Sequence, residues 1–379
     1  MTQICRVAVL LAASSIGCSK AEPAASKESK ALGSRTEVKM VTSTAKRQWL
    51  ELAVQRFRVE RPDLKVMVKF AASNEEIAEI LQGTDKPTVF SPNDGALLTE
   101  LDAKWRVLHG SALVAAEGDE APRSLFRTPF VFLGSESAVR PMVAGSPDGQ
   151  LSWSSIQAEV KRRRAARLPP LRFGHVAFSK GSAGLSAVLL IGVEIFGKPV
   201  LTLDQAKDER FARKLDDIEA EATLVAPTTG ALATRFSQVG ADQLDLIFTY
   251  ENSAAELVHA LAERWGQPLR IYYPTYSVWS DQPAAVLQTD WVTPEQHAGA
   301  LAWLHFLEAR AMQLEAAKMG LRPNDPELLD LTDGPFAKLK KFGFRRDLPP
   351  EAPKPSEAVT EALVSLSQRR DHAAQVAVH

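Results

Sequence analysis

The chain has 379 residues, and its 45 Lys and Arg residues nearly balance its 46 Asp and Glu residues, which gives a formal net charge of −1 at pH 7. A general nucleic-acid-binding protein would be strongly basic, so this balance argues against nucleic acid as a partner. The length is sufficient for two domains of ordinary size.

The first residues predict an exported precursor. Arg6 supplies a positive charge, and Val7–Ile16 is a mainly apolar run that is shorter than the roughly 20 residues needed to span a bilayer. Such a run followed by small residues is typical of a signal peptide. The residues Ser15-Ile16-Gly17-Cys18 resemble the lipobox of bacterial lipoproteins, although Ser15 stands where Leu is usual. An ordinary signal peptide with an incidental cysteine is the alternative.

Cleavage before Cys18 would remove Cys5, the only other cysteine. The mature protein would then contain no disulfide and no cysteine-based metal site. Lipid chains on Cys18 would provide a stable membrane anchor in the cell envelope. The polar, small-residue stretch 19–35 predicts a disordered tether between the anchor and the folded body.

The body begins with alternating strand and helix patterns. Strands are expected at Glu37–Thr42, Lys65–Phe70 and Thr88–Ser91, and helices at Arg47–Val59 and Asn74–Leu81. The first helix is indicated by apolar residues at helical spacing, and the second strand by strict alternation of apolar and polar residues.

The same alternation returns later in the chain. Arg172–Ala177 and Leu244–Tyr250 are strand candidates, and each leads into a helix, Gly184–Phe196 and Asn252–Arg264 respectively. This order favours parallel α/β sheets with helices on both faces. A short helix is also expected at Glu357–Gln368, beyond a proline-rich stretch.

Signatures of catalysis are missing from the sequence, which contains no G-x-S-x-G, H-E-x-x-H or Walker A motif. We therefore expect no catalytic residue, no enzyme activity, no cofactor and no metal. His175 ends a predicted strand where a cleft could lie, but a packed histidine is the simpler interpretation. The basic residues within 161–167 favour a solvated helix face, with an anionic docking surface as the alternative.

Polar residues follow one predicted strand after another. In open α/β sheets, ligands bind outside the carboxyl ends of the strands, where helix N-termini offer free N–H groups. Each residue could instead be an ordinary helix cap. The ligand-binding residues expected on this basis are Ser43, Thr44, Ser73, Ser91, Asn93, Ser182, Thr228 and Tyr250, with Glu251 beside the last.

The body resembles the type 2 periplasmic solute-binding proteins of ABC-type transport, and within them the molybdate/sulfate-type binders and the solute-binding domains associated with von Willebrand factor A domains. Four stretches carry the resemblance. They are the first strand with Ser43-Thr44 and its helix, FGHVAFSKGSAGLSAVL at Phe173–Leu189, DLIFTYENSA at Asp245–Ala254, and Thr293–Pro323 with its final Gly-x-Arg-Pro turn.

The resemblance implies an α/β protein of two lobes joined by a hinge of two crossovers, near residues 127–135 and 268–276. The implied segments are 1–17 signal peptide, 18–35 tether, 36–127 first lobe, 128–274 second lobe, 275–345 return to the first lobe and 346–379 C-terminal tail.

The function implied is capture of a small ligand by a monomeric, membrane-anchored lipoprotein that serves an ABC-type permease or a sensor. Neutral hydroxyls and helix N-termini favour an oxyanion or a small anionic solute. Glu251 and the paired Tyr272-Tyr273 leave a metal-cation binder open, because phenolates and carboxylates ligate hard cations. A third alternative is an interaction protein of the envelope that kept the fold without a ligand.

Overall fold

The computed structural model describes residues 35–71, 73–146, 148–240, 243–261, 264, 268–329 and 335–376, without the side chains of 73–74, 259, 335 and 369–376. Met1–Arg35 forms a unit separate from Thr36–His379. The predicted signal peptide and Cys18 lie outside the described residues, as does the predicted tether up to residue 34. The second unit, Thr36–His379, is the folded body of the protein.

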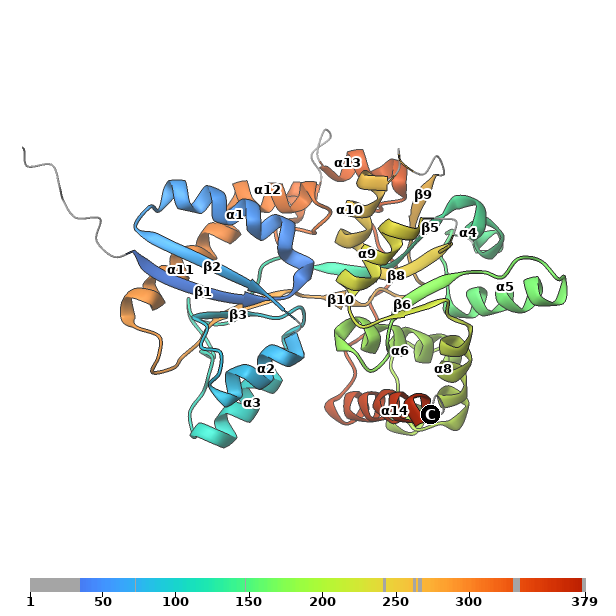
Figure 1. Cartoon of the computed structure of the whole chain (residues 1–379), viewed down its shortest axis with the longest axis horizontal. Helices are drawn as coiled ribbons and strands as arrows, with labels where there is room; N and C mark the ends of the chain where they lie inside the picture. Colours follow the sequence, from blue (N-terminus) through green and yellow to red (C-terminus); the bar gives the residue numbers. More distant parts are fainter. Residues whose placement is uncertain are drawn as a thin grey trace, which may run out of the picture. The chain divides into compact units, whose positions relative to one another are not determined.

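The first lobe is built on a five-stranded sheet in the order β2-β1-β3-β11-β4 (Figure 1). Its strands are β1 (Thr36–Thr42), β2 (Leu64–Phe70), β3 (Val89–Ser91), β4 (Arg123–Ser124) and β11 (Pro283–Val286). β1 pairs in parallel with β2 and β3, so that Thr42 lies beside both Phe70 and Ser91. The carboxyl ends of these three strands therefore meet at one edge of the sheet.

Helices cover both faces of this sheet. Trp49 and Phe57 of α1 share one core with Trp303 of α11, while Leu98 and Leu101 of α3 belong to a second core. The helices of the lobe are α1 (Arg47–Glu60), α2 (Ser73–Gln82), α3 (Gly95–His109), α11 (Pro294–Glu308) and α12 (Arg310–Lys318), with the 3-10 turns η1 (Thr44–Lys46) and η2 (Pro326–Leu329).

The second lobe has a sheet in the order β10-β5-β8-β6-β7, with β9 also paired to β5. Its strands are β5 (Thr128–Ser135), β6 (Phe173–Val176), β7 (Leu224–Ala226), β8 (Leu246–Tyr250), β9 (Leu269–Tyr272) and β10 (Trp279–Ser280). β6 is parallel to β7 and β8, but β5 runs antiparallel to β8 and β9. The expectation of parallel sheets is therefore corrected to mixed sheets, because the chain enters this lobe along a strand that opposes β8.

Helices surround this second sheet and bury their apolar faces against it. In chain order they are α4 (Glu136–Val143), α5 (Trp153–Ala165), α6 (Gly181–Phe196), α7 (Leu203–Ala206), α8 (Glu209–Glu221), α9 (Thr229–Val239) and α10 (Glu251–Leu261). α6 is buried along nearly all of its length. Within the described ranges, no helix combines the length and the apolar character needed to cross a membrane.

Besides a third crossing of the chain between Lys318, where α12 ends, and Pro335, two connections join the lobes, at residues 125–127 and 281–282. The backbone N–H of Leu125 donates to the carbonyl of Gln282 (3.2 Å), so the connections lie side by side. Gln282 has a φ of 43°, an uncommon conformation for a residue with a side chain. The second connection comes later than the expected 268–276, because Leu269–Tyr272 is held in the second sheet by pairing with β5.

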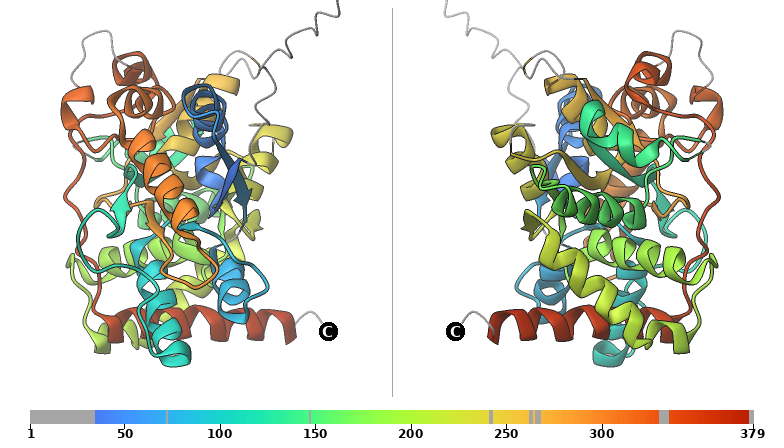
Figure 2. Two further views of the ribbon diagram at one scale, coloured as in Figure 1. Left: turned by 90° about the vertical axis from the view of Figure 1, so that its left-hand side faces the viewer. Right: turned by 90° about the vertical axis from the view of Figure 1, so that its right-hand side faces the viewer.

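The C-terminal segments belong to the second lobe. The chain there forms α13 (Pro335–Leu339), η3 (Lys340–Phe342) and α14 (Glu357–Val376). Phe344 and the α14 residues Val359, Leu363 and Leu366 are buried in the core of that lobe. Figure 2 shows α14 running beneath α6. The sequence predicted that all of 275–345 returns to the first lobe and that 346–379 is a tail outside the core. This packing corrects both predictions.

Candidate functional site

The strand ends of the two lobes face each other across a cavity of about 390 Å³, here called the strand-end cavity. It lies where ligands bind in open α/β sheets, outside the carboxyl ends of the strands. Its polar lining side chains are Ser43, Thr44, Glu75, Asn93, Ser179, Lys180, Ser182, Thr228, Thr229, Tyr250 and Gln368. The fold thus brings together the predicted residues Ser43, Thr44, Asn93, Ser182, Thr228 and Tyr250.

Tyr250 lies at the meeting point of the two lobes. Its phenol oxygen is 2.8 Å from Ser182 Oγ, and it accepts a hydrogen bond of 2.8 Å from Asn93 Nδ2 in the first lobe. The ring is fully buried and packs 4.5 Å from the ring of Phe130. Burial raises the pKa of Tyr250 to about 12, so the phenol is neutral at physiological pH and acts as a hydrogen-bonding group.

Asn93 has bonding capacity to spare. Its buried Oδ1 has no hydrogen-bond partner within the described residues. An unpaired buried polar atom costs free energy, and a bound solute could satisfy it. Since the amide oxygen and nitrogen can exchange places by rotation, Asn93 can offer either an acceptor or a donor to a solute.

The helices of the second lobe start at the cavity. α6 follows β6 through a tight turn in which Gly181 has a φ of 61°. A Cβ atom on Gly184 would lie 2.3 Å from the carbonyl oxygen of Ala177, so only glycine fits there. The side chain of Lys180, the N-cap residue of α6, makes no capping hydrogen bond, whereas Thr228 caps α9 by accepting from the N–H of Ala231 (3.1 Å). Helix N-termini favour negative charge.

The two lobes are in direct contact beside the cavity. Asn252 Nδ2 of the second lobe donates to the carbonyl of Ala45 in the first (2.9 Å). A Cβ atom on Gly230 would meet Thr44 Oγ1 at 3.3 Å. Together with the bond between Asn93 and Tyr250, these contacts describe a closed arrangement of the lobes.

Ser91 does not join this lining as expected. The Ser91 side chain is buried and donates to the carbonyl of Pro283 (2.6 Å), which ties β3 to β11. Ser73 begins α2, but its side chain lies outside the described part of the structure. A position at the end of a strand therefore did not tell which hydroxyls line the cavity and which hold the sheet together.

Glu251 also differs from its predicted role. Its carboxylate is fully buried and accepts two hydrogen bonds of 2.8 Å from Arg322 Nε and Nη2, and one from the hydroxyl of Tyr273. Burial raises the pKa of the Tyr273 phenol well above its usual range, and the adjacent Glu251 carboxylate raises it further. Glu251 therefore lies in an internal ion pair and points away from the strand-end cavity.

His175 is a packed residue rather than a cleft residue. Its ring is fully buried, stacks 4.6 Å from the ring of Phe178, and has Nδ1 2.8 Å from the carbonyl oxygen of Val176. Burial lowers the pKa of His175 to about 4, so the ring is neutral at pH 7.

One residue at the site was missed by the sequence analysis. Lys46 is buried immediately behind the first-lobe wall, and its ammonium lies 3.4 Å from Ser43 Oγ. Lys46 directly precedes the predicted helix Arg47–Val59, and no local signal in the sequence marks it as buried.

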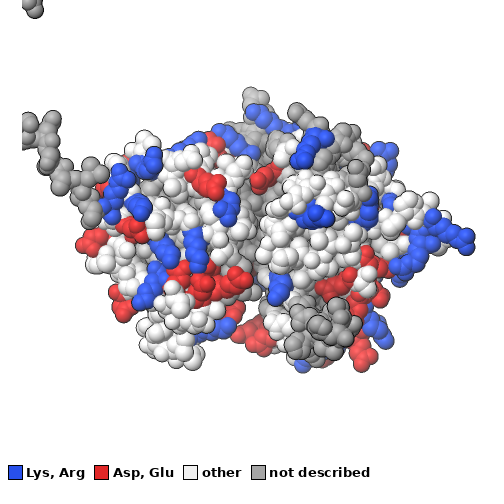
Figure 3. Space-filling model, viewed as in Figure 1, with Lys and Arg blue, Asp and Glu red and all other residues white. Residues whose placement is uncertain are grey.

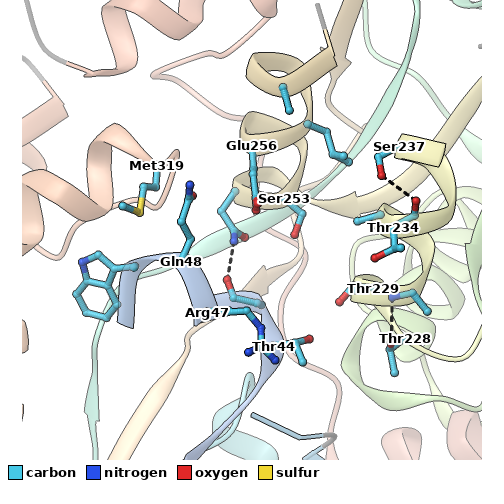
Figure 4. A pocket seen from close by; sticks show the side chains of 18 of the residues that line it. Thr44, Arg47, Gln48, Thr228, Thr229, Thr234, Ser237, Ser253, Glu256 and Met319 are labelled. Atoms are coloured by element: carbon cyan, nitrogen blue, oxygen red, sulfur yellow. Dashed lines mark hydrogen bonds between the residues drawn. The ribbon is translucent and has the colours of Figure 1, made fainter. Parts of the chain in front are cut away.

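A larger cavity of about 620 Å³, here called the helix-flank cavity, adjoins the first at Thr44 and Thr228. Figure 4 shows it between the start of α1 and the sides of α9 and α10, with Gln48, Ser237 and Glu256 facing in. Its lining comes mainly from helix sides. The strand-end cavity is therefore the better candidate site, since strand ends and the N-terminus of α6 converge there.

Two charged clusters lie elsewhere. Glu76, Glu79 and Asp85 bring carboxylates close enough together for a metal ion, but Lys69 Nζ already lies 2.7–2.9 Å from all three. Basic side chains gather over the end of α5 (Figure 3), where Arg162 and Arg163 both pair with Glu159. Both clusters are internally charge-paired.

No family model and no curated protein matches the sequence. Solved structures match its fold. The sulfate-binding protein SubI from Mycobacterium tuberculosis is similar with a TM-score of 0.53 and 15% identity, over 83% of this chain and 94% of that one. Iron-bound HitA from Pseudomonas aeruginosa is similar with a TM-score of 0.56 and 14% identity, over 88% of this chain and 99% of that one. The substrate-binding protein of an ABC transporter from Agrobacterium tumefaciens is similar with a TM-score of 0.58 and 13% identity, over 89% of this chain and 94% of that one.

These likenesses show the fold. The chain has the two-lobed α/β architecture of the periplasmic solute-binding proteins, as the sequence analysis expected. The similar structures include a sulfate-binding protein and an iron-bound protein, so this one fold holds ligands of opposite charge.

Proposed function

We propose that this protein is an extracytoplasmic solute-binding lipoprotein that captures a small solute in the strand-end cavity and delivers it to an ABC-type permease. The observation that carries the proposal is the convergence of neutral polar groups from both lobes on one enclosed space, with Asn93 and Tyr250 bonded across it. Hinge closure around a solute would form this arrangement.

A small anion, such as an oxyanion of the molybdate/sulfate type, suits this lining best. Ser43, Ser182 and Thr228 offer hydroxyls, and the N-terminus of α6 offers N–H groups. A metal cation is less suited, because Tyr250 and Tyr273 are neutral and hydrogen-bonded and Glu251 is paired with Arg322. No chemical change of the solute is proposed.

The test is calorimetric titration of the purified protein with molybdate, sulfate and phosphate against ferric citrate and small amines, after mass spectrometry of any co-purified solute. Ser182→Ala should weaken binding by about tenfold, the loss expected for one hydrogen bond to a charged group. Ser237→Ala, in the helix-flank cavity, is the matched control and should bind normally. Normal binding by Ser182→Ala together with weaker binding by Ser237→Ala would instead indicate that the solute binds in the helix-flank cavity.

Binding of no solute in the panel by the wild-type protein would favour the alternative of an envelope interaction protein. The lipid anchor is tested separately, by incorporation of labelled palmitate into the wild-type protein and into Cys18→Ser. Label should be lost in the variant. A soluble, unmodified mature form made from the wild-type gene would contradict anchoring at Cys18.

A further inference from the structure

Lys46 is a lysine buried in the first lobe, with 1% of its surface exposed. Its ammonium lies among four oxygen atoms. Nζ is 2.7 Å from the carbonyl of Ser91, 2.8 Å from that of Pro92, 3.1 Å from Thr42 Oγ1 and 3.4 Å from Ser43 Oγ. These partners join the carboxyl end of β1 to that of β3.

The surroundings of Nζ suit an ammonium better than a neutral amine. The two carbonyl oxygens can only accept hydrogen bonds. The Thr42 hydroxyl donates its own hydrogen to the carbonyl of Ser91 (2.9 Å), so its oxygen also accepts from Lys46. An amine lone pair would face these acceptors, whereas an ammonium has three N–H donors to offer them.

No carboxylate is among the four oxygen partners of Lys46. Asp281, in the second connection, acts on it electrostatically, but the Asp281 carboxylate accepts from the N–H of Gly95 (2.8 Å) and approaches Lys354 (3.4 Å). Burial lowers the pKa of Lys46 well below its usual range, and Asp281 partly opposes this. A buried charge without a close counter-ion is costly, and such groups concentrate at functional sites.

The charge lies directly behind the wall of the strand-end cavity. Ser43, a partner of Nζ, lines the cavity, and so does Asn93, the neighbour of Pro92. We propose that Lys46 is the counter-charge of this cavity and makes it selective for a small anionic solute, either a carboxylate or an oxyanion. This inference rests on the proposed function, which requires only that some solute binds there.

The other charged groups near the cavity are less effective. Glu75 and Lys180 line it but are exposed, so water and salt screen them. Lys46 acts through the protein interior, where a charge is screened less. An anion that enters should raise the pKa of Lys46, opposing burial. Anion binding should therefore take up protons at those pH values where Lys46 of the ligand-free protein has lost its proton. Asp94, Asp281 and the rim residues Glu75 and Lys180 share this electrostatic environment, since Asp94 acts on Tyr250 and lies close enough to Asp281 to be affected by it.

The test uses three probes with the same tetrahedral sulfur centre and different charge: sulfate, methanesulfonate and neutral dimethyl sulfone. Acetate and malonate form the carboxylate arm. Calorimetric affinities are measured for wild type, Lys46→Met and Lys46→Gln, whose amide can still donate to the carbonyls of Ser91 and Pro92. Lys104→Met, at an exposed lysine of the same lobe, is the control.

Loss of the charge should weaken the best anion by at least about tenfold and leave dimethyl sulfone unchanged, as expected for a unit charge acting over a few ångströms. Circular dichroism must show that the variants are folded. If neither Lys46 variant folds, measurements on the wild-type protein alone test the inference. Titrations at increasing pH, each in two buffers of different ionisation enthalpy, should then show proton uptake with the anion where Lys46 titrates, and none with dimethyl sulfone.

Equal anion affinity in wild type and a folded Lys46 variant would overturn the inference. So would wild-type binding of amines or neutral solutes in preference to every anion, although the proposed function would survive that result. Failure of the wild type to bind any solute, charged or neutral, would overturn both.

Discussion

The side-chain amide of Asn93 in the first lobe donates a 2.8 Å hydrogen bond to the phenol oxygen of Tyr250 in the second. The same phenol lies 2.8 Å from Ser182 at the start of α6. Tyr250 therefore links the closure of the lobes to the wall that would receive the solute, and removal of its hydroxyl should affect both.

Tyr250→Phe should keep the ring packed against Phe130 and remove the bond between the lobes. One hydrogen bond contributes a net of about 1 kcal/mol, so we expect a shift of the lobes towards an open state and about fivefold weaker solute binding. Small-angle X-ray scattering of the ligand-free protein should show a larger radius of gyration. Tyr272→Phe, outside the cavity lining, should match wild type. An unchanged radius and affinity in Tyr250→Phe would show that the bond does not hold the lobes together.

Glu251→Gln should destabilise the whole protein. The variant leaves the Arg322 guanidinium, with 6% of its side chain exposed, without its charge partner. Breaking a buried ion pair in this way costs about 3–5 kcal/mol in the free energy of unfolding. Arg310→Met, in the exposed pair with Asp325, should cost less than about 1 kcal/mol. Urea denaturation gives both values, and similar losses in the two variants would argue against a special role for the buried pair.

His175 should make the protein sensitive to acid. Its pKa is about 4 in the folded state against 6.5 for the free side chain, so between these values the unfolded chain binds a proton that the folded chain does not. The free energy of unfolding should therefore fall by about 3 kcal/mol as the pH drops from 6.5 to 4, and the contribution should then level off.

His175→Phe should remove that part of the pH dependence, as measured by urea denaturation at pH 7, 5.5 and 4. His305→Phe is the control, because His305 is about half exposed beside Asp119. If the free energy of unfolding of His175→Phe depends on pH in the same way as that of wild type, other groups cause the acid sensitivity.

Leu363→Ala should show that α14 is part of the second lobe. Leu363 is fully buried, and replacement of a buried leucine by alanine costs about 2–5 kcal/mol. Leu168→Ala, at a position that is 45% exposed, should cost much less. Thermal unfolding monitored by circular dichroism compares the two. A loss below about 1 kcal/mol at Leu363 would fit a detachable tail, contrary to its packing in the core.

The sequence by itself determined several strands and helices of each lobe and their alternation, whereas α3, α8 and α9 were not predicted. β1, α1 and β2 end within one residue of their predicted ends, and β8 ends at Tyr250 as expected. Periodicity within a short window decides these elements, because a strand or helix buries one face according to the spacing of its apolar residues. The position of a polar residue after such a strand then places it at the sheet edge, which is why Ser43, Asn93, Ser182 and Tyr250 could be named.

Only the tertiary structure decided which of these polar groups line the strand-end cavity. Glu251 follows Tyr250 directly, yet it turns to Arg322, a residue 71 positions later that the end of α12 brings against it. Lys46 is buried because the end of β3 supplies its carbonyl partners, Ser91 and Pro92, although α1, β2 and α2 lie between them and Lys46 in the chain. Hydrogen bonds and ion pairs act over a few ångströms in space, whereas sequence patterns describe neighbours along the chain, so the partners of a buried charge become known only when the fold brings them together.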